Sequence, residues 1–182
     1  MPTFEPEDIK YSYSPDHAPI GTVAAGESFT VITADGFTGK YDDPADFSPQ
    51  TAAWVEENLD GVTGPISVEG AEPGGAVAVT IEELEINTKG TVVISRCKAL
   101  SPQDWWHEED HVVNLTVSDG GIQLREDWSV PATPLIGCIA TAPARETVFS
   151  KHEGSYGGNM DVGEVTVGAT IVLPVEVPGA GL

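Results

Sequence analysis

The chain of 182 residues has few basic side chains, with 8 Lys and Arg against 29 Asp and Glu and a net charge of −21. A surface of this charge repels phosphate backbones and anionic lipid headgroups. The sequence also lacks any apolar run near the roughly 18 residues that a membrane span needs, and residues 1–10 carry charge and proline in place of a signal-peptide core. We therefore expect no nucleic-acid partner, no membrane partner and a cytoplasmic location.

Cysteine is scarce as well, with two in the chain. Cys97 and Cys138 both lie in apolar runs, where cysteine usually behaves as a small buried hydrophobe, and no His or Asp is spaced beside Cys138 for thiol catalysis. A chain of this length buries roughly two thirds of its unfolded surface and needs neither a disulfide nor a metal for stability. The sequence thus predicts a single domain over residues 1–182.

Helix signals are few, and short β-branched segments separated by Gly, Pro, Asp and Asn recur instead. This pattern is typical of an all-β fold, here a β-sandwich or barrel-like domain with one or two short helices. Ser48 and Ser101 each precede a proline and start the two expected helices, and Asp119-Gly120-Gly121 is expected to be the bend of a hairpin. The expected strands cover residues 28–33, 66–69, 76–84, 91–97, 111–117, 121–125, 136–141 and 170–177.

One short pattern favours zinc chemistry. His107-Glu108-Glu109-Asp110-His111 fits the HExxH arrangement, in which two histidines one helical turn apart bind zinc and the glutamate acts on the metal-bound water. Strand periodicity begins again at His111, whereas a metalloprotease needs this motif well inside a longer helix. A zinc hydrolase at His107 and His111 is therefore an alternative hypothesis, and a solvated charged turn is the competing interpretation.

A second candidate site lies in the glycine-rich loop near the C-terminal end. Gly157 and Gly158 allow the backbone to approach a ligand closely, and Asn159 and Asp161 present an amide and a carboxylate two residues apart. In an extended segment this spacing places both side chains on one face, where they suit a divalent cation or a small polar substrate. A plain Asx-turn remains the competing interpretation. Glu69, in the Gly- and Pro-rich residues 61–74, is a weaker candidate.

Several segments, taken in order, resemble the acetamidase/formamidase family. Residues 63–75 are similar to the family segment TGP-h-x-VEGAEPGD, with Gly75 in place of Asp, and residues 134–144 are similar to PhIGhhGhAPA. Residues 156–161 match the HGGNMD loop, and residues 173–182 match LPVFVPGALL. With the opening strand at residues 19–29, the resemblance covers about residues 17–182. Each motif is weak alone, and together they are specific.

This resemblance implies a β-rich hydrolase that cleaves the C–N bond of small linear amides, such as formamide or acetamide, to ammonia and a carboxylate. Asp161 is the implied metal ligand or base, and Asn159 would orient the amide or a ligand. Gly157, Gly158, Tyr156 and Glu69 are the expected substrate-binding residues. A divalent metal, zinc or calcium, would polarise the carbonyl and lower the pKa of an attacking water.

The sequence departs from the family pattern in two ways. Tyr156 stands where the family loop has histidine, and a phenol with an ordinary pKa near ~10 is a poor base at neutral pH. The family also continues after the segment that ends at Leu182 into an Asp-, His- and Glu-containing segment. We therefore expect a partner chain that supplies the C-terminal half, or a homo-oligomer. The alternative is a non-catalytic β-sandwich subunit with a binding or structural role.

Overall fold

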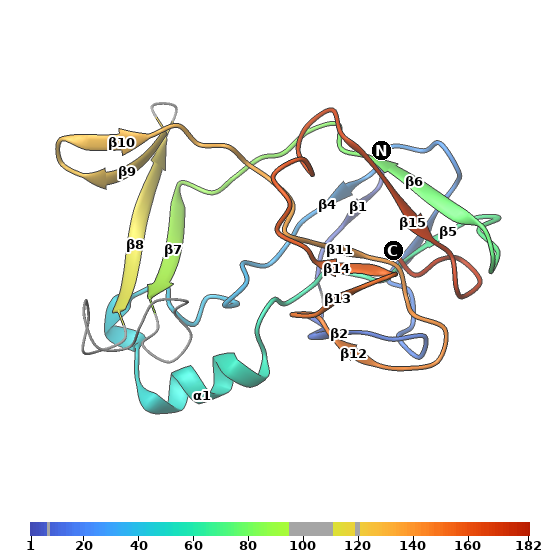
Figure 1. Ribbon diagram of the computed structural model, residues 1–182, viewed down its shortest axis with the longest axis horizontal. Helices are drawn as coiled ribbons and strands as arrows, with labels where there is room; N and C mark the ends of the chain where they lie inside the picture. Colours follow the sequence, from blue (N-terminus) through green and yellow to red (C-terminus); the bar gives the residue numbers. More distant parts are fainter. Residues whose placement is uncertain (7, 95–110, 119–120) are drawn as a thin grey trace. The chain divides into compact units, whose positions relative to one another are not determined.

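The computed structural model describes residues 1–6, 8–94, 111–118 and 121–182, and its described part consists mainly of short strands. The all-β class that the sequence predicts is confirmed. The chain forms two compact units (Figure 1). The first comprises Met1–Thr38, Glu56–Leu84 and Pro134–Leu182, and the second comprises Gly39–Val55 and Glu85–Thr133. A single domain over residues 1–182 stays a prediction.

The first unit is built from short strand pairs that join segments far apart in the sequence. β6 pairs antiparallel with β15, β2 with β12, and β14 lies between β11 and β13 (Figure 1). β1 and β4, and likewise β3 and β5, pair in parallel. The bounds are β1 Thr3–Phe4, β2 Ser12–Tyr13, β3 Gly21–Val23, β4 Thr30–Val31, β5 Ile66–Val68, β6 Ala76–Thr80, β11 Cys138–Ala140, β12 Val148–Phe149, β13 Glu153–Gly154, β14 Gly157–Asn159 and β15 Thr170–Pro174.

The core of the first unit lies beneath the β6–β15 ribbon. Leu173 pairs with Val77 across the ribbon, and the two pack with Val175 and Ala180 in one buried cluster. The next residue of the strand, Val172, points to the other face and is 65% exposed. This alternation follows from the two-residue period of a strand, which the sequence shows in Val77 and Val79.

The second unit contains an antiparallel sheet in the order β10-β9-β8-β7. Ser118 of β8 pairs with Gly121 of β9, as the expected hairpin requires, and residues 119–120 of its expected bend lie outside the described residues. Asn114 of β8 donates its side-chain amide to the carbonyl oxygen of Asp42 at 2.6 Å, and Lys40 lies over the ring of Trp54. The bounds are η1 Pro44–Asp46, β7 Lys89–Ile94, β8 His111–Ser118, β9 Gly121–Arg125 and β10 Trp128–Val130. Helix α1, Pro49–Glu57, begins in this unit, and its last residues, Glu56 and Glu57, belong to the first unit.

Helix α1 begins where the sequence predicts. The Ser48 hydroxyl oxygen accepts a hydrogen bond from the amide of Thr51 at 3.1 Å, and Pro49 occupies the first helical position. This cap satisfies one of the amide groups that a helix N-terminus leaves without a partner. The second expected helix, which begins at Ser101, lies outside the described residues.

Each of the eight expected strand segments contains a strand or most of one, and residues 95–97 of the segment 91–97 lie outside the described residues. The segment 121–125 coincides with β9, and residues 111–117 fall within β8. Other segments extend past the strand, as in residues 76–84, because β6 ends at Thr80. The two-residue strands β1, β2, β12 and β13 were not expected, since two residues are too few to show a period of two.

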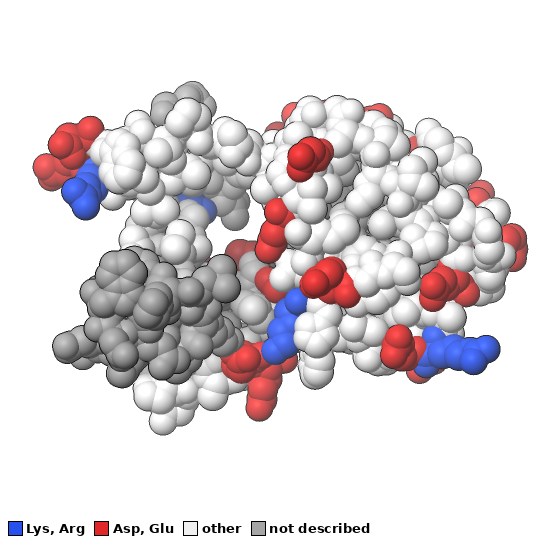
Figure 2. All heavy atoms as spheres, viewed as in Figure 1, with Lys and Arg blue, Asp and Glu red and all other residues white. Residues whose placement is uncertain are grey.

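Acidic side chains are distributed over the visible face of the molecule (Figure 2). This distribution agrees with the net charge of −21 and with acid that is spread along the sequence. Among the described residues, no helix is long and apolar enough to cross a membrane.

The burial pattern of β15 predicts unequal effects on stability for truncations at neighbouring residues. Leu173→Ala, at a side chain that is 3% exposed, should lower the free energy of unfolding by about 2–5 kcal/mol because it leaves a cavity. Val172→Ala, on the exposed face, should change it by less than about 0.5 kcal/mol. Urea unfolding of both variants measures the difference. Equal losses would show that this ribbon does not cover a core.

Candidate active site

The candidate site begins with the pairing of β11 and β14. Cys138 lies directly opposite Asn159 in this antiparallel pair. Residues opposite each other in such a pair project to the same face. The Cys138 thiol donates a hydrogen bond to Oδ1 of Asn159, with 3.3 Å between the sulfur and the oxygen. The strand register therefore joins a thiol and an amide side chain that are 21 residues apart.

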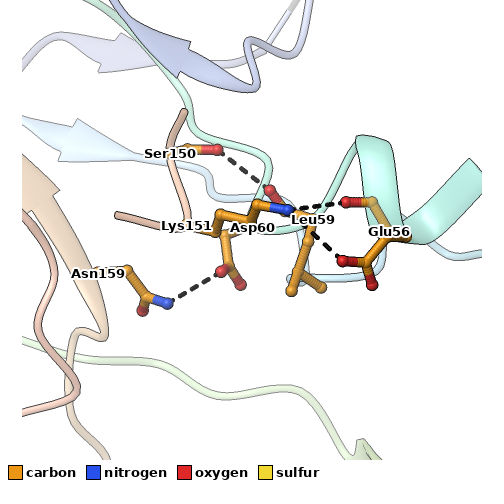
Figure 3. Close-up of polar contacts among 6 residues, drawn as sticks. All are labelled: Glu56, Leu59, Asp60, Ser150, Lys151 and Asn159. Atoms are coloured by element: carbon orange, nitrogen blue, oxygen red, sulfur yellow. Dashed lines mark hydrogen bonds and ion pairs between the residues drawn. The ribbon is translucent and has the colours of Figure 1, made fainter. Parts of the chain in front are cut away.

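The other end of the Asn159 amide contacts a carboxylate from a distant segment. Nδ2 of Asn159 donates to Oδ2 of Asp60 at 3.0 Å (Figure 3). Asp60 follows helix α1 and has φ 59°, in the left-handed region that few residues other than glycine adopt. Its amide donates to the carbonyl oxygen of Gly36 at 2.9 Å, which fixes the backbone in this conformation.

Contacts made by two further residues, Ser150 and Lys151, hold the segment around Asp60 in place (Figure 3). The Ser150 hydroxyl, which is fully buried, donates to the carbonyl oxygen of Leu59 at 3.1 Å. Lys151 donates to the carbonyl oxygen of Glu56 at 3.1 Å, and its ammonium lies 3.7 Å from the Glu56 carboxylate. The ion pair is partly exposed and adds little stability by itself. Its main consequence is to place a positive charge near Asp60.

Electrostatics distinguish Asp60 from an ordinary surface carboxyl. Burial raises the pKa of Asp60, the charge of Asp161 raises it further, and Lys151 opposes both effects. Like charges and loss of water disfavour the ionised form, whereas a nearby cation favours it. The site therefore holds a half-buried carboxylate next to a second, exposed one.

Asp161 lies beside this cluster in a geometry that differs from the expected one. Its φ is 48°, so the backbone is left-handed and not extended. The expected extended spacing of Asn159 and Asp161 is wrong in this respect. Instead, the amides of Met160 and Asp161 both donate to the carbonyl oxygen of Gly137, at 3.0 and 3.2 Å. Asp161 is exposed, and its charge acts on both Asp60 and Cys138.

The expected loop is wrong at residues 157–159, which form strand β14, and strand packing explains the glycines there. Gly157 and Gly158 are buried in β14, both with positive φ. A Cβ at Gly157 would overlap the carbonyl oxygen of Ile139, and a Cβ at Gly158 would overlap that of His152. The absent side chains thus let β11 and β13 approach β14 from both sides. Close approach of a ligand to these glycines stays a prediction.

Tyr156 and Glu69 lie in different surroundings. The ring of Tyr156 is buried and packs against Tyr13 with 5.7 Å between the ring centroids, in a cluster with Ala140. Burial is the main cause that raises the pKa of the Tyr156 phenol. Glu69 is exposed just after β5, where its amide donates to the carbonyl oxygen of Val23. Substrate binding by either residue stays a prediction.

Metal binding is not tested by these contacts. Among the described residues, no group of three or more His, Cys, Asp or Glu side chains is placed to hold a metal ion. Residues 107–110 of the HExxH pattern lie outside the described part of the chain, and His111 is the first residue of strand β8. A zinc or calcium ion at Asp161, and a zinc site at His107 and His111, both stay predictions.

The sequence did not identify Asp60 as a site residue. It stands in an ordinary-looking Asp60-Gly61 turn, 99 residues before its partner Asn159. Its left-handed backbone could be suspected from that Asp-Gly pair, because Asp adopts this conformation more readily than most residues. The sequence also did not predict the pairing of Cys138 with Asn159, because this pairing depends on the register of two strands.

No protein-family model and no curated protein matches the chain. Solved structures do. A predicted acetamidase/formamidase from Thermoanaerobacter tengcongensis is 27% identical with a TM-score of 0.87, and an acetamidase from Yersinia enterocolitica is 25% identical with a TM-score of 0.82. They cover 98% and 100% of this chain, which covers 58% of each. A gamma lactamase from Delftia acidovorans shares the fold at 17% identity, with a TM-score of 0.83. The match covers 100% of this chain and 60% of the lactamase chain.

These structures assign the chain to an amidase-type all-β fold. Within that class the resemblance is to the acetamidase/formamidase family, as the sequence motifs predict, and it is confirmed by the two structures named for that family. The chain spans about three fifths of the length of the structures it matches.

The packing of β14 predicts that Gly158 tolerates no side chain. Gly158→Ala should lower the free energy of unfolding by more than about 2 kcal/mol, because the new methyl group meets the backbone of β13 and the positive φ is strained. Gly163→Ala, where a Cβ meets open space, is the matched control and should have an effect below about 0.5 kcal/mol. Thermal unfolding measures both. A stable Gly158→Ala protein would contradict the strand packing described here.

The surroundings of Cys138 predict that its thiol is alkylated slowly. Burial is the main cause that raises the pKa of Cys138 to about 11, with Asp60 adding to it. At pH 8 the thiolate fraction should be roughly a hundredfold below that of a thiol at the ordinary value of 9.0. Iodoacetamide alkylation of a Cys97→Ser variant should be correspondingly slow and should accelerate up to about pH 11. Rapid labelling at pH 8 would instead indicate an activated nucleophile.

Proposed function

We propose that this chain is part of an amide hydrolase that cleaves the C–N bond of small linear amides, such as formamide or acetamide, to ammonia and a carboxylate. The carrying observation is the gathering of Asp60, Asn159 and Asp161 in a fold shared with acetamidases. Amide hydrolysis requires a group that takes a proton from water and returns it to the departing nitrogen. A carboxylate whose pKa is raised by burial and by a neighbouring charge, as that of Asp60 is, suits such work because the raised pKa makes it a better proton acceptor.

The exposed position of Asp161 supports a role at the substrate. In the proposed reaction Asp161 faces the amide, either as a proton-transfer group or as a ligand to a divalent ion. The described residues do not form a metal-binding group by themselves, so any ion would need ligands from elsewhere. No step of the proposed reaction is assigned to such an ion.

The proposal includes a second polypeptide segment. The matched structures are longer than this chain, which covers 58% of two of them. We propose that a complementary chain supplies the remaining part of the family length and completes the site, and that the assembly acts in the cytoplasm. A homo-oligomer is compatible with this arrangement.

The proposed function predicts ammonia release by the assembled protein. A tagged chain isolated from its native cells, together with the polypeptide that co-purifies, should release ammonia and carboxylate in equal amounts from formamide or acetamide. Asp161→Asn should lower kcat/KM by about a hundredfold or more, since it removes a proton-transfer or ligand group. Glu164→Gln, at an exposed carboxylate in the same segment, should retain the activity.

Three results would contradict parts of this proposal. An assembly that folds and releases no ammonia from either amide would favour the non-catalytic binding subunit. Full activity of the isolated chain would contradict the proposed need for a complementary polypeptide. Full activity of the Asp161→Asn variant would contradict the proposed role of Asp161 in the reaction.

A further inference from the structure

The orientation of the Asn159 amide follows from its two partners. An ionised aspartate has only acceptor atoms, so Asp60 requires the Nδ2 end of the amide. The Oδ1 end then faces Cys138 and requires a donor. Cys138 can supply one, because a pKa of about 11 keeps its thiol protonated at neutral pH. The thiol thus fixes which end of the amide faces Asp60.

Asp60 is also held from the backbone side. Both polar groups of the peptide bond that leads into this left-handed residue are hydrogen bonded, because the Asp60 amide donates to Gly36 and the Leu59 carbonyl oxygen accepts from Ser150. A strained conformation persists only where its surroundings determine it, and such positions cluster at functional sites. The carboxylate therefore has a fixed position and a fixed direction.

The charged and titratable groups around Asp60 come from several elements. Asp161 follows β14, and Lys151 lies between β12 and β13 and pairs with Glu56 of α1. Cys138 on β11 and Tyr13 on β2 complete the surroundings, and the Tyr13 hydroxyl donates to the carbonyl oxygen of Ser150 at 3.3 Å. Lys151 is the cation among them, which allows Asp60 to ionise near a second carboxylate.

We propose that Asp60 is the carboxylate that takes the proton from the attacking water, and that Asn159 and Cys138 are positioning residues that direct it. This inference rests on the amide hydrolysis proposed above and assigns its proton transfer to a residue outside the sequence motifs. Asp161 then meets the substrate, while Asn159 acts through Asp60.

The proposed proton transfer needs only the amide, one water molecule and Asp60. The water oxygen bonds to the amide carbonyl carbon as Asp60 accepts one water proton, which gives a tetrahedral intermediate and a neutral Asp60. The C–N bond then breaks as Asp60 returns that proton to the nitrogen. The products are the carboxylic acid and ammonia, and the acid loses its remaining proton to solvent. Nothing is oxidised or reduced.

The first test removes the proton acceptor in the assembled enzyme. Asp60→Asn should lower kcat by about 10²–10⁴-fold, and Asp60→Glu should recover part of it, because a carboxylate is restored slightly out of place. Glu164→Gln is the matched control with unchanged kcat. The wild-type rate should fall as the pH decreases through the pKa of Asp60, which burial and Asp161 raise above 3.8. An active Asp60→Asn enzyme would overturn the assignment.

The second test measures positioning without any catalysis. The carboxyl carbon of Asp60, followed by NMR during an acid titration, reports its pKa in the wild type, Cys138→Ala and Cys138→Ser. Cys138→Ala frees the Asn159 amide to turn its oxygen toward Asp60, which should raise the Asp60 pKa because an oxygen disfavours the ionised carboxylate. Cys138→Ser keeps a donor and should stay close to the wild type. The neutral thiol carries no charge, so a lost charge does not explain such a rise.

The sign of the shift decides the second test. An alanine that merely admits water would lower the Asp60 pKa, since hydration favours the ionised form. A lowered or unchanged value in Cys138→Ala would therefore overturn the positioning role. If the assembly hydrolyses amides and Asp60→Asn stays active, this inference fails and the proposed function survives. If no preparation hydrolyses amides, the proposed function fails, and the titration still tests the positioning.

Discussion

The register between β11 and β14 is the constraint on which the candidate site depends. It places Cys138 opposite Asn159, and a slip by one residue would turn Asn159 to the other face of the sheet. Gly157 and Gly158 secure this register, because only residues without a side chain let β11 and β13 approach so closely. A feature of backbone packing thereby determines where an amide group is presented.

The second constraint comes from a segment far away in the sequence. Asp60 reaches Asn159 because helix α1 ends just before it and the buried Ser150 holds the carbonyl group of Leu59. The protein carries a net charge of −21, so two carboxylates in one place meet further repulsion from the rest of the molecule. Lys151, held by Glu56, offsets part of that repulsion locally.

Sequence reasoning succeeded where the signal is local. The Ser48 cap and strand β9 each depend on neighbouring residues, and each was located correctly. It failed where the signal is a long-range contact. Asp60 has no motif of its own, and the left-handed conformation of Asp161 overrides the simple alternation of an extended chain. Several strands are two residues long, because they are formed by pairing with distant segments.

The assignment of separate roles to the polar groups follows from the capacity of the Asn159 side chain. An asparagine has two N–H donors and two acceptor positions on its oxygen, and the contacts to Asp60 and Cys138 use one of each. If the Asn159 amide rotated to offer its NH₂ group to a substrate, its oxygen would face Asp60, and this would disfavour the ionised form of Asp60. Asn159 can therefore touch a substrate only through the donor and acceptor that remain. Asp161 is exposed, and the orientation of the Asn159 amide does not depend on it, so it is the carboxylate better placed to contact the substrate amide.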